Sequence, residues 1–596
     1  MRMQLSALCI AVLLAVVCAS SFTGVQSARP VKDNAQLPLD LDEAVSAALR
    51  GSGVGIDFNS NLKVDPASDN ATALDRYMAM PDPEYSWSYN GSTTRGITPG
   101  ISGWTGHNLI LTSQRWLTDK EAGSCSLWQH DMMVIIPDNY DNTFETASIW
   151  ITDGLDPVGS HADYPQNVIV AATMATMSRA ITVCLWQVPN QRCIFPDDPK
   201  QQSREEDAVI AYTWRKYIDL TRAGDARADM WPLRLPMVKA SIRAMDAATE
   251  FLSKCKDCTN VNSVTVPNTW VTCGASKRGW TTWLTGAVDK RIIGMVPIVM
   301  DALNQHKLFH RWYQNMGGWS FAIKDYTDMD LMAELDSPEF QELLTIIDPY
   351  SYLDRFQFPK LVISATGDEF FQTMDDHFWF KDMPGKTLLL KAPNADHSEA
   401  TGMPTILPSV ACFIDTIIQE RKALKEGRER TSDDLGMRHP VLTWNWWYEG
   451  EGQNTTGYMN VTIDTNNGPA PQKVWLRHAY TEPQSGRLDF RWFSLDEDCP
   501  IPKQHFLGQD VCPTMDMVWA EKKLSPIETT DTTVTYHASV KAPEVGWGGF
   551  NMELAFPGIS ELLFDLPYII TTQTAIVPDT QPFPDCSGKE CEGKLV

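Results

Sequence analysis

The chain has 596 residues, of which 43% are hydrophobic and 10% aromatic, and its formal net charge is −25. This length supplies enough apolar material for large cores and for more than one domain. The negative charge excludes nucleic acid as an expected partner, because phosphates would repel the protein, and it excludes attachment to anionic membrane surfaces by charge.

Residues 1–27 have the pattern of a secretory signal peptide. Arg2 precedes an apolar run from Leu8 to Val17, and small residues follow it. Cleavage after Ser20 or Ser27 fits this pattern, and we favour Ser27. The run is too short to cross a membrane comfortably, and no later segment is apolar for long enough. We therefore predict a secreted, extracellular protein with no membrane insertion.

Sequons and cysteines agree with export. N-glycosylation sequons begin at Asn70, Asn90, Asn454 and Asn460. The chain has 13 cysteines, and an odd number remains after Cys9 and Cys18 leave with the signal peptide, so one thiol should be free. We expect the local disulfides Cys499–Cys512 and Cys586–Cys591, a loop disulfide Cys255–Cys258, and a buried thiol at Cys273. A redox or zinc pair is the alternative at Cys255 and Cys258, although no second pair matches it.

Strand-like and helix-like segments alternate after about residue 100, whereas residues 29–100 show little periodicity. Strands are expected at 131–136, 147–152, 181–186, 270–273, 292–300, 360–365 and 386–391, and helices at about 204–217, 236–254 and 406–424. Continuous apolar strands that alternate with helices indicate a mostly parallel sheet with helices on both faces. This α/β domain is expected to span residues 28–435, with an irregular N-terminal extension.

The pattern changes beyond a charged stretch at 421–438, which we interpret as a linker. Alternating β-rich segments at 441–448, 458–464 and 474–478 predict a smaller sandwich-like domain over 440–575, followed by an irregular tail, 576–596. An aromatic cluster in this part contains Trp444, Trp446, Trp447 and Tyr448. Such a cluster fits either a sandwich core or a surface that binds sugars or a partner protein.

One serine lies on a sharp turn between a strand and a helix. The strand Trp270–Cys273 leads into Gly274-Ala-Ser276-Lys-Arg-Gly279, and an amphipathic helix follows. A serine between glycines at such a turn is typical of the nucleophile elbow of α/β hydrolases, where the glycines permit a strained turn and close helix packing. The second glycine comes one residue later than in G-x-S-x-G, because Arg278 holds its place. An ordinary turn with a capping serine is the alternative interpretation.

An acid and a histidine follow in the chain order that this fold uses. Asp368 comes after the strand at 360–365, and His397 comes after the strand at 386–391. We predict Ser276, His397 and Asp368 as a catalytic triad, in which the histidine removes the serine proton and the carboxylate fixes its tautomer. Glu369 and Asp301 are rival candidates for the acid.

Oxyanion donors are expected beside this serine. The backbone N–H of Lys277 is one candidate, and the loop at Asp153 and Gly154, after an earlier strand, could supply the second. The side chains of Lys277 and Arg278 either add positive charge beside the serine or are solvated residues that open a helix.

No motif predicts a cofactor or a metal. His306 and His310 have the spacing of a metal-binding pair but lack the glutamate of H-E-x-x-H, so we expect a packed helix face there. No glycine-rich loop that could hold phosphate is present.

The string Gly274–Thr281 resembles the PhoPQ-activated pathogenicity-related protein family, whose eukaryotic members include autocrine proliferation repressor A-like proteins. Shorter strings that resemble the family are Ile151–Gly154, Ile298–Asp301, Thr366–Asp368 and Asn394–His397, and the likeness runs from about residue 75 to 570. The resemblance implies an α/β-hydrolase core with Ser276, Asp368 and His397 as the triad. The serine turn also resembles that of glucuronoyl esterases, where a cation follows the nucleophile and glycine comes three residues after it.

Two hypotheses of function follow. The first is a secreted serine hydrolase, esterase or peptidase-like, which cleaves a small-molecule ester or amide or a peptide through an acyl-enzyme intermediate. The second is a secreted autocrine signalling protein that represses cell proliferation through a cell-surface receptor, because the family includes secreted signals of this kind. Carbohydrate binding by the aromatic side chains of the β-rich domain is a third interpretation with less support.

Overall fold

A computed structural model describes residues 49–53, 56–159, 165–255, 261–427, 438–495, 499, 502–506, 509–513, 517–559 and 566–596. The predicted signal peptide, Cys258 and residues 428–437 of the predicted linker lie outside these described residues.

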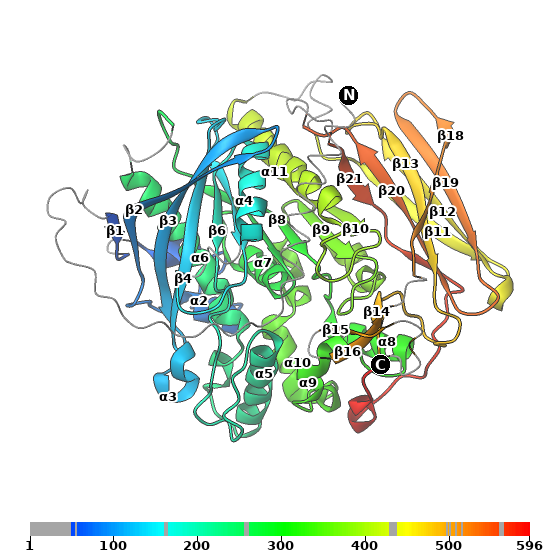
Figure 1. Ribbon diagram of the computed structural model, residues 1–596, viewed down its shortest axis with the longest axis horizontal. Helices are drawn as coiled ribbons and strands as arrows, with labels where there is room; N and C mark the ends of the chain where they lie inside the picture. The colour runs from blue at the N-terminus through cyan, green and yellow to red at the C-terminus, as the bar shows by residue number, and fades with distance from the viewer. Residues whose placement is uncertain are drawn as a thin grey trace.

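A large sheet runs through the molecule (Figure 1). Its first part has the order β1 (Leu49–Gly51), β2 (Ser86–Thr98), β3 (Ser102–Arg115), β4 (Leu127–Pro137), β6 (Thr182–Leu185), β5 (Thr146–Ile151), β7 (Thr269–Ala275), β8 (Ile292–Ile298), β9 (Lys360–Ala365) and β10 (Thr387–Ala392). From β6 to β10 every neighbouring pair is parallel, whereas β1 to β4 are antiparallel. The predicted mostly parallel sheet is confirmed.

Helices cover both faces of the parallel strands. Helices α6 (Arg234–Lys254) and α7 (Lys277–Val288) pack on one face, and α4 (Pro165–Ser178) and α11 (Met403–Lys425) pack on the other. Strand β5 is buried throughout, and its side chains divide between the two cores: Ile149 and Ile151 face α6 and α7, and Trp150 faces α4 and α11. This alternation explains why the strands are continuously apolar in sequence.

Other helices fill the connections. They are α2 (Ala73–Ala79), α3 (Asp119–Ala122), α5 (Asp207–Arg222), α8 (Gln305–Met316), α9 (Lys324–Thr327) and α10 (Pro338–Ile347). Helices α5 and α8 to α10 lie together beyond one end of the sheet (Figure 1). None of the helices in the described ranges combines the length and hydropathy needed to cross a bilayer.

The N-terminal region is not irregular as the sequence predicted. Strands β2 and β3 form a long antiparallel hairpin, and a register shift occurs between Tyr89 and Thr93. Strand β2 lies near the edge of the sheet and is largely exposed after Tyr89. Polar residues can occupy such exposed positions, so the strand shows little hydrophobic alternation in its sequence.

The C-terminal strands continue the large sheet and add a second one. Strands β21 (Tyr568–Thr571), β20 (Gly548–Phe556), β13 (Lys473–Tyr480) and β17 (Ala520–Lys523) extend it beyond β10, and β22 (Ala575–Val577) pairs with β20. The second sheet contains β11 (Leu442–Glu449), β12 (Thr456–Asp464), β19 (Thr533–Lys541) and β18 (Pro526–Thr529). A small third sheet contains β14 (Phe493–Ser494), β16 (Gln509–Pro513) and β15 (Gln504–Phe506).

The second sheet packs on the extension of the first as a sandwich. Met459 and Val461 of β12 share a buried core with Phe550 and Met552 of β20. One sheet of the sandwich is therefore continuous with the parallel part of the large sheet through β10 and β21, which pair at Leu389 and Thr571. The domain limits at 28–435, 440–575 and 576–596 stay a prediction.

The aromatic cluster of β11 divides between the two faces of its sheet. Trp444 and Trp446 pack toward the core, with ring centroids 5.1 Å from Phe380 and 5.3 Å from His377. Trp447 instead stacks on Tyr458 at 5.4 Å. The core interpretation accounts for the first two tryptophans.

Three disulfides are described. Cys499–Cys512 and Cys586–Cys591 form as the sequence predicted, and Cys125–Cys193 joins cysteines 68 residues apart that spacing alone did not pair. Cys255 is also disulfide-bonded. Buried free thiols lie at Cys184, Cys273 and Cys412, so three rather than one are free among the described residues.

Of the three described disulfides, the two that close the longest and the shortest loop should differ in their effect on stability. The chain-entropy model gives about 4 kcal/mol for the 68-residue separation of Cys125–Cys193 and about 2 kcal/mol for the 5-residue separation of Cys586–Cys591. Paired cysteine-to-alanine variants, compared by urea unfolding, should therefore rank in that order. Equal losses from the two double variants would contradict the entropic interpretation.

Candidate active site

Ser276 occupies a strained turn between β7 and α7. Its backbone has φ +55° and ψ −125°, a conformation that costs a non-glycine residue about 1–3 kcal/mol. The Ser276 N–H donates to the Ile298 carbonyl of β8 at 2.8 Å. A Cβ atom on Gly274 would lie 2.7 Å from the Arg278 carbonyl oxygen, and one on Gly279 would lie 2.8 Å from that of Ile298. Both glycines are therefore required by close backbone approach.

The structure brings Ser276, His397 and Asp368 into one hydrogen-bonded chain. His397 Nε2 lies 2.8 Å from Ser276 Oγ, and His397 Nδ1 lies 2.9 Å from both carboxylate oxygens of Asp368. Backbone N–H groups of Phe370 and Phe371 donate to Asp368 Oδ1 at 2.7 and 3.1 Å. Asp368 is buried, so these donors hold its carboxylate toward the imidazole. This geometry can pass the serine proton to His397.

The two rival acids occupy other positions. Glu369 Oε2 accepts a hydrogen bond from the backbone N–H of His397 at 3.1 Å, and burial raises the pKa of this carboxyl well above its usual range. Burial raises the pKa of Asp301 to about 7, and its Oδ1 lacks a hydrogen-bond partner among the described residues. Of the three candidate acids, Asp368 is the one that contacts the imidazole.

C-terminal residues hold the loops that carry Asp368 and His397. The Trp492 N–H donates to the Gly367 carbonyl at 3.1 Å, directly before Asp368. Asn394 forms two hydrogen bonds with the backbone of Trp519, from Nδ2 to the carbonyl at 3.1 Å and from the Trp519 N–H to Oδ1 at 2.7 Å. The loops that carry Asp368 and His397 are thus held by residues outside the α/β region.

Lys277 and Arg278 are neither solvated nor unpaired. Lys277 Nζ lies 2.9 Å from Glu206 Oε2 and 3.0 Å from Asp207 Oδ2, and Arg278 makes a bidentate pair with Glu206 at 2.6 and 2.7 Å. Burial alone would raise the pKa of Glu206, but the charges of Arg278 and Lys277 outweigh it and hold that pKa well below its usual range. The alternative that both are solvated residues is therefore wrong. Sequence reasoning missed Glu206 and Asp207, because α5 is distant from the elbow in the chain.

The predicted oxyanion donors lie at the same end of the sheet as Ser276. Ile151 of β5 pairs with Gly274 of β7, so the residues after each strand emerge side by side. Lys277 is the first residue of α7, where a backbone N–H has no partner within the helix. The carboxylate of Asp153 accepts hydrogen bonds from Thr152 Oγ1 at 3.0 Å and Asn167 Nδ2 at 3.1 Å, so the donor that this residue could offer is its backbone N–H. The roles of Lys277 N–H and Gly154 stay a prediction.

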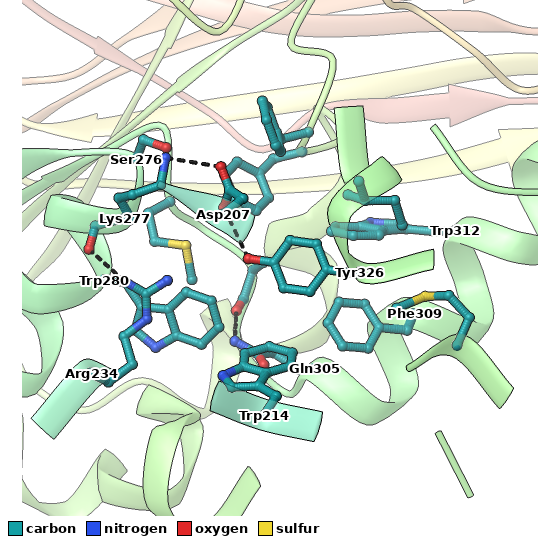
Figure 2. A pocket seen from close by; sticks show the side chains of 16 residues that line it. Asp207, Trp214, Arg234, Ser276, Lys277, Trp280, Gln305, Phe309, Trp312 and Tyr326 are labelled. Carbon is teal, nitrogen blue, oxygen red and sulfur yellow. Dashed lines mark hydrogen bonds and ion pairs between the residues drawn. The ribbon is translucent and has the colours of Figure 1, made fainter. Parts of the chain in front are cut away.

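An aromatic pocket opens beside Ser276 (Figure 2). Its walls include Trp214, Trp280, Phe309, Trp312 and Tyr326, and its free volume is about 50 Å³. That volume admits a few water molecules or a small organic group. The lining comes from α5, α7, α8 and α9. The sequence did not predict α9 and gave no sign that the other three helices meet.

Arg234 forms part of the same wall and was not predicted. Its guanidinium lies 4.1 Å from the ring centroid of Trp280, and Nη1 donates to the Lys277 carbonyl at 3.0 Å. Burial lowers the pKa of Arg234 to about 10. Arg234 therefore braces the first turn of α7 directly below the serine (Figure 2).

The four predicted glycosylation sites lie on the outside of the molecule to different degrees. Asn70, Asn90 and Asn454 are exposed. Asn460 is half-buried on β12, and its Oδ1 lies 2.8 Å from His537 Nδ1. Glycan attachment at these positions stays a prediction.

Replacing Glu206 by Gln should destabilise the elbow, because two cations lose their shared carboxylate. The side chain of Glu206 is 30% exposed, so we expect a loss of about 2–3 kcal/mol, below the 3–5 kcal/mol of a fully buried pair. The neighbouring variant Glu205→Gln is the matched control: its pair with Arg192 is about half exposed, and its loss should stay below about 1 kcal/mol.

The effect of Glu206→Gln should also depend on pH. The folded state holds the pKa of Glu206 below that of the unfolded chain, about 4.3, so the carboxylate stabilises the fold fully above that pH. The contribution is lost as the pH falls toward the depressed folded-state pKa. We expect the difference in the free energy of unfolding between wild type and Glu206→Gln to be smaller at about pH 3 than at pH 7, as measured by denaturant unfolding. A difference that does not change with pH would refute the charge-based explanation.

Comparisons with known proteins agree with the family resemblance. The model of the family described as PhoPQ-activated pathogenicity-related protein matches residues 74–491. Autocrine proliferation repressor protein A of Dictyostelium discoideum is 32% identical over 528 residues, which are 87% of this chain and 93% of that protein.

Solved structures with partial similarity include two bacterial esterases. Acetyl xylan esterase 1 from Thermoanaerobacterium sp. JW/SL YS485 matches with a TM-score of 0.31 and 13% identity, over 55% of this chain and 86% of its own. Acetyl xylan esterase from Paenibacillus sp. R4 matches with a TM-score of 0.34 and 11% identity, over 57% of this chain and 93% of its own. The family match and the shared sequence together show that this chain belongs to the PhoPQ-activated pathogenicity-related protein family.

Proposed function

We propose that the protein is a serine hydrolase that cleaves an ester or amide bond through an acyl-enzyme intermediate. The observation that carries the proposal is the 2.8 Å contact of Ser276 Oγ with His397 Nε2, continued at 2.9 Å from Nδ1 to the buried Asp368. In this arrangement the serine can act as the nucleophile, the histidine as the general base, and the carboxylate as the group that orients the histidine.

The proposed reaction needs no group beyond this chain, the substrate and water. His397 Nε2 takes the hydroxyl proton as Ser276 Oγ attacks the carbonyl carbon, and Asp368 stabilises the imidazolium. The same proton then passes to the leaving oxygen or nitrogen as its bond to the carbonyl carbon breaks. Water attacks the acyl-enzyme, gives a proton to His397, and releases the acid while Ser276 regains its hydrogen.

The pocket beside Ser276 favours a small acyl group. Its free volume of about 50 Å³ and its aromatic walls suit a few apolar atoms rather than a long chain. The backbone N–H groups of Lys277 and Gly154 are the proposed donors to the oxyanion that develops during attack.

A fluorophosphonate probe, which reacts with activated serines, should label the folded wild-type protein. Ser276→Ala should abolish labelling and lower ester hydrolysis by about 10³-fold or more, because the nucleophile is lost. Ser398→Ala is the matched control, since this exposed hydroxyl beside His397 donates to Asp396 rather than to the imidazole. Equal labelling of wild type and Ser276→Ala would refute the hydrolase proposal.

Export from the cell is part of the proposal. Three described disulfides support it, because such bonds form and persist in oxidising compartments. The predicted signal peptide, 1–27, and the sequons at Asn70, Asn90, Asn454 and Asn460 belong to the same proposal.

A second candidate function is an autocrine signal that represses proliferation. It is favoured by the relative named autocrine proliferation repressor protein A, which matches 87% of this chain. A fold that hosts hydrolases can also serve as a binding scaffold, so a receptor-binding role does not require turnover.

A substitution at Ser276 distinguishes the two proposed functions. If receptor binding alone restrains growth, purified Ser276→Ala protein should slow cell division as strongly as wild type at equal concentration. Cell counts over several divisions measure this effect, and circular dichroism checks that the variant is folded. A folded variant without effect on growth would assign the signal to hydrolysis instead.

A further inference from the structure

A cluster of three metal-ligating side chains lies away from Ser276, on the outer side of α8. His306 and His310 are one turn apart on this helix, and the Nε2 atom of each lies 3.1 Å from Asp336 Oδ1. One nitrogen or oxygen of each residue lies within 4.8 Å of those of the other two. Three potential ligand atoms therefore converge on one point.

The spacing of these atoms fits a bound cation. Zinc binds imidazole nitrogen and carboxylate oxygen at about 2.0–2.2 Å, which puts two ligands of a tetrahedral site about 3.4 Å apart. The observed 3.1 Å separations differ from that value by a few tenths of an ångström. A cation could enter from solvent, because the side chains of His306 and Asp336 are 38% and 35% exposed.

Residues of the C-terminal tail orient two of the three ligands. His310 Nδ1 lies 2.8 Å from Asp585 Oδ1, which favours a proton on Nδ1 and directs the lone pair of Nε2 toward His306 and Asp336. The other oxygen of Asp336, Oδ2, accepts hydrogen bonds from the Gly588 N–H at 3.0 Å and Ser587 Oγ at 3.4 Å. Protein metal sites usually have such supports. A histidine ligand donates its other ring N–H to a carboxylate, and a carboxylate ligand accepts hydrogen bonds from neighbouring residues.

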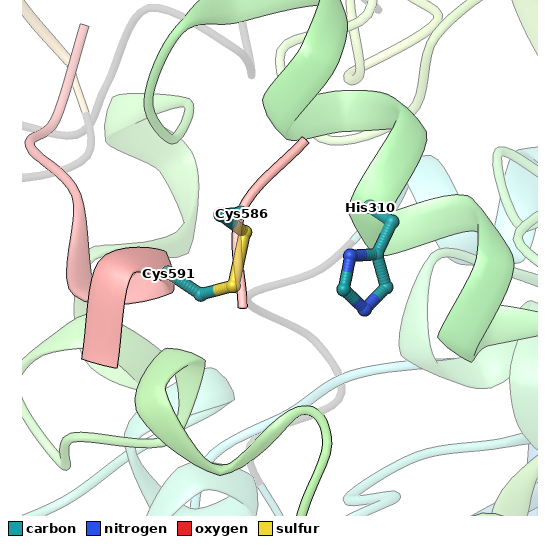
Figure 3. A group of neighbouring side chains, drawn as sticks. All are labelled: His310, Cys586 and Cys591. Carbon is teal, nitrogen blue, oxygen red and sulfur yellow. A yellow bond between two sulfur atoms is a disulfide. The ribbon is translucent and has the colours of Figure 1, made fainter. Parts of the chain in front are cut away.

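The nearby sulfur atoms do not belong to this site. Cys586 and Cys591 lie next to His310 but are joined in a disulfide, so neither offers a thiolate (Figure 3). Their bond closes the tail segment that carries Ser587 and Gly588. The disulfide thus supports the ligands without supplying one.

We propose that His306, His310 and Asp336 bind one divalent cation of the Zn²⁺ class, with water completing the coordination. Two imidazoles and one carboxylate suit Zn²⁺, Co²⁺ or Ni²⁺ better than Ca²⁺ or Mg²⁺, which prefer oxygen ligands. This proposal departs from the sequence-based expectation of no metal, because Asp336 and the tail residues are distant from α8 in the chain.

The role of the cation is to fasten the tail to a wall of the active-site pocket. Helix α8 presents Gln305, Phe309 and Trp312 to that pocket and His306 and His310 to the metal site. The tail continues past the site to Val596, whose N–H donates to the Trp319 carbonyl at 2.8 Å. The cation would join α8 to the loop of Asp336, and the segment from Asp585 to Gly588 would be held indirectly, through its hydrogen bonds to His310 and Asp336.

The test uses the secreted full-length chain, without a polyhistidine tag, after removal of metals by chelation. We expect about one equivalent of Zn²⁺ to bind in calorimetry, Co²⁺ to give the visible absorption of a tetrahedral site, and Zn²⁺ to slow amide hydrogen exchange in residues 579–596. His306→Gln and Asp336→Asn should each weaken Zn²⁺ binding about 100-fold or more, and Asp585→Asn about 10–100-fold.

His505→Gln is the matched control, because His505 also pairs with a carboxylate, Asp510, on an exposed surface. It should leave Zn²⁺ affinity unchanged. The proposal is overturned if the chelated protein takes up no Zn²⁺, or if His306→Gln and His505→Gln bind it equally well. Asp585→Asn keeps all three ligands, so its weaker binding tests the site even if a ligand variant fails to fold.

Discussion

The positive-φ backbone of Ser276 is the constraint on which the rest of the site depends. A serine with φ +55° is unfavourable in isolation, so neighbouring structure must hold it there. The hydrogen bond from its N–H to Ile298 of β8 supplies one support, and the absence of side chains at Gly274 and Gly279 removes the clashes that would push the turn apart. The parallel pairing of β5, β7 and β8 thus sets where the serine oxygen points.

Electrostatics supply the second support of the same turn. Lys277 and Arg278 open α7, where cations oppose the helix dipole, yet both are largely buried. Glu206 and Asp207, at the start of α5, neutralise them, and Arg234 holds the Lys277 carbonyl from below. The paired carboxylates mean that these cations act by fixing the position of the first turn of α7 rather than as free positive charge beside Ser276. Removing one partner leaves a buried charge unpaired. The resulting loss in the free energy of unfolding is larger than the net stabilisation that the intact ion pair provides.

The sequence was sufficient for the parts of the molecule that local chemistry determines. Apolar strands from β4 to β10, the helices α6 and α11 and the turn at Ser276 follow from hydrophobic periodicity and glycine positions, and the elements found there match the expected ranges within a few residues. The sequence did not predict the strand β2, because its polar residues lie on an exposed part of the hairpin. Partners that the fold brings from elsewhere, such as Glu206 for Arg278 or Asp336 for His310, have no local signal. Long-range ion pairs and pocket walls are properties of the assembled helices, so one sequence without its structure does not reveal them.

The C-terminal β-rich part is integral to the candidate active site. Strand β10, which leads into the His397 loop, pairs with β21, so the sandwich shares the sheet that carries the histidine. Trp492 and Trp519 hydrogen-bond to Gly367 and Asn394, and these contacts fix the loops of Asp368 and His397 relative to each other. A histidine that must lie within 2.8 Å of the serine oxygen tolerates little loop motion, since a displacement of about 1 Å can cost 100-fold in rate. The change in sequence pattern near residue 440 therefore marks a change in the kind of strand, and residues on both sides of it hold the loops of Asp368 and His397.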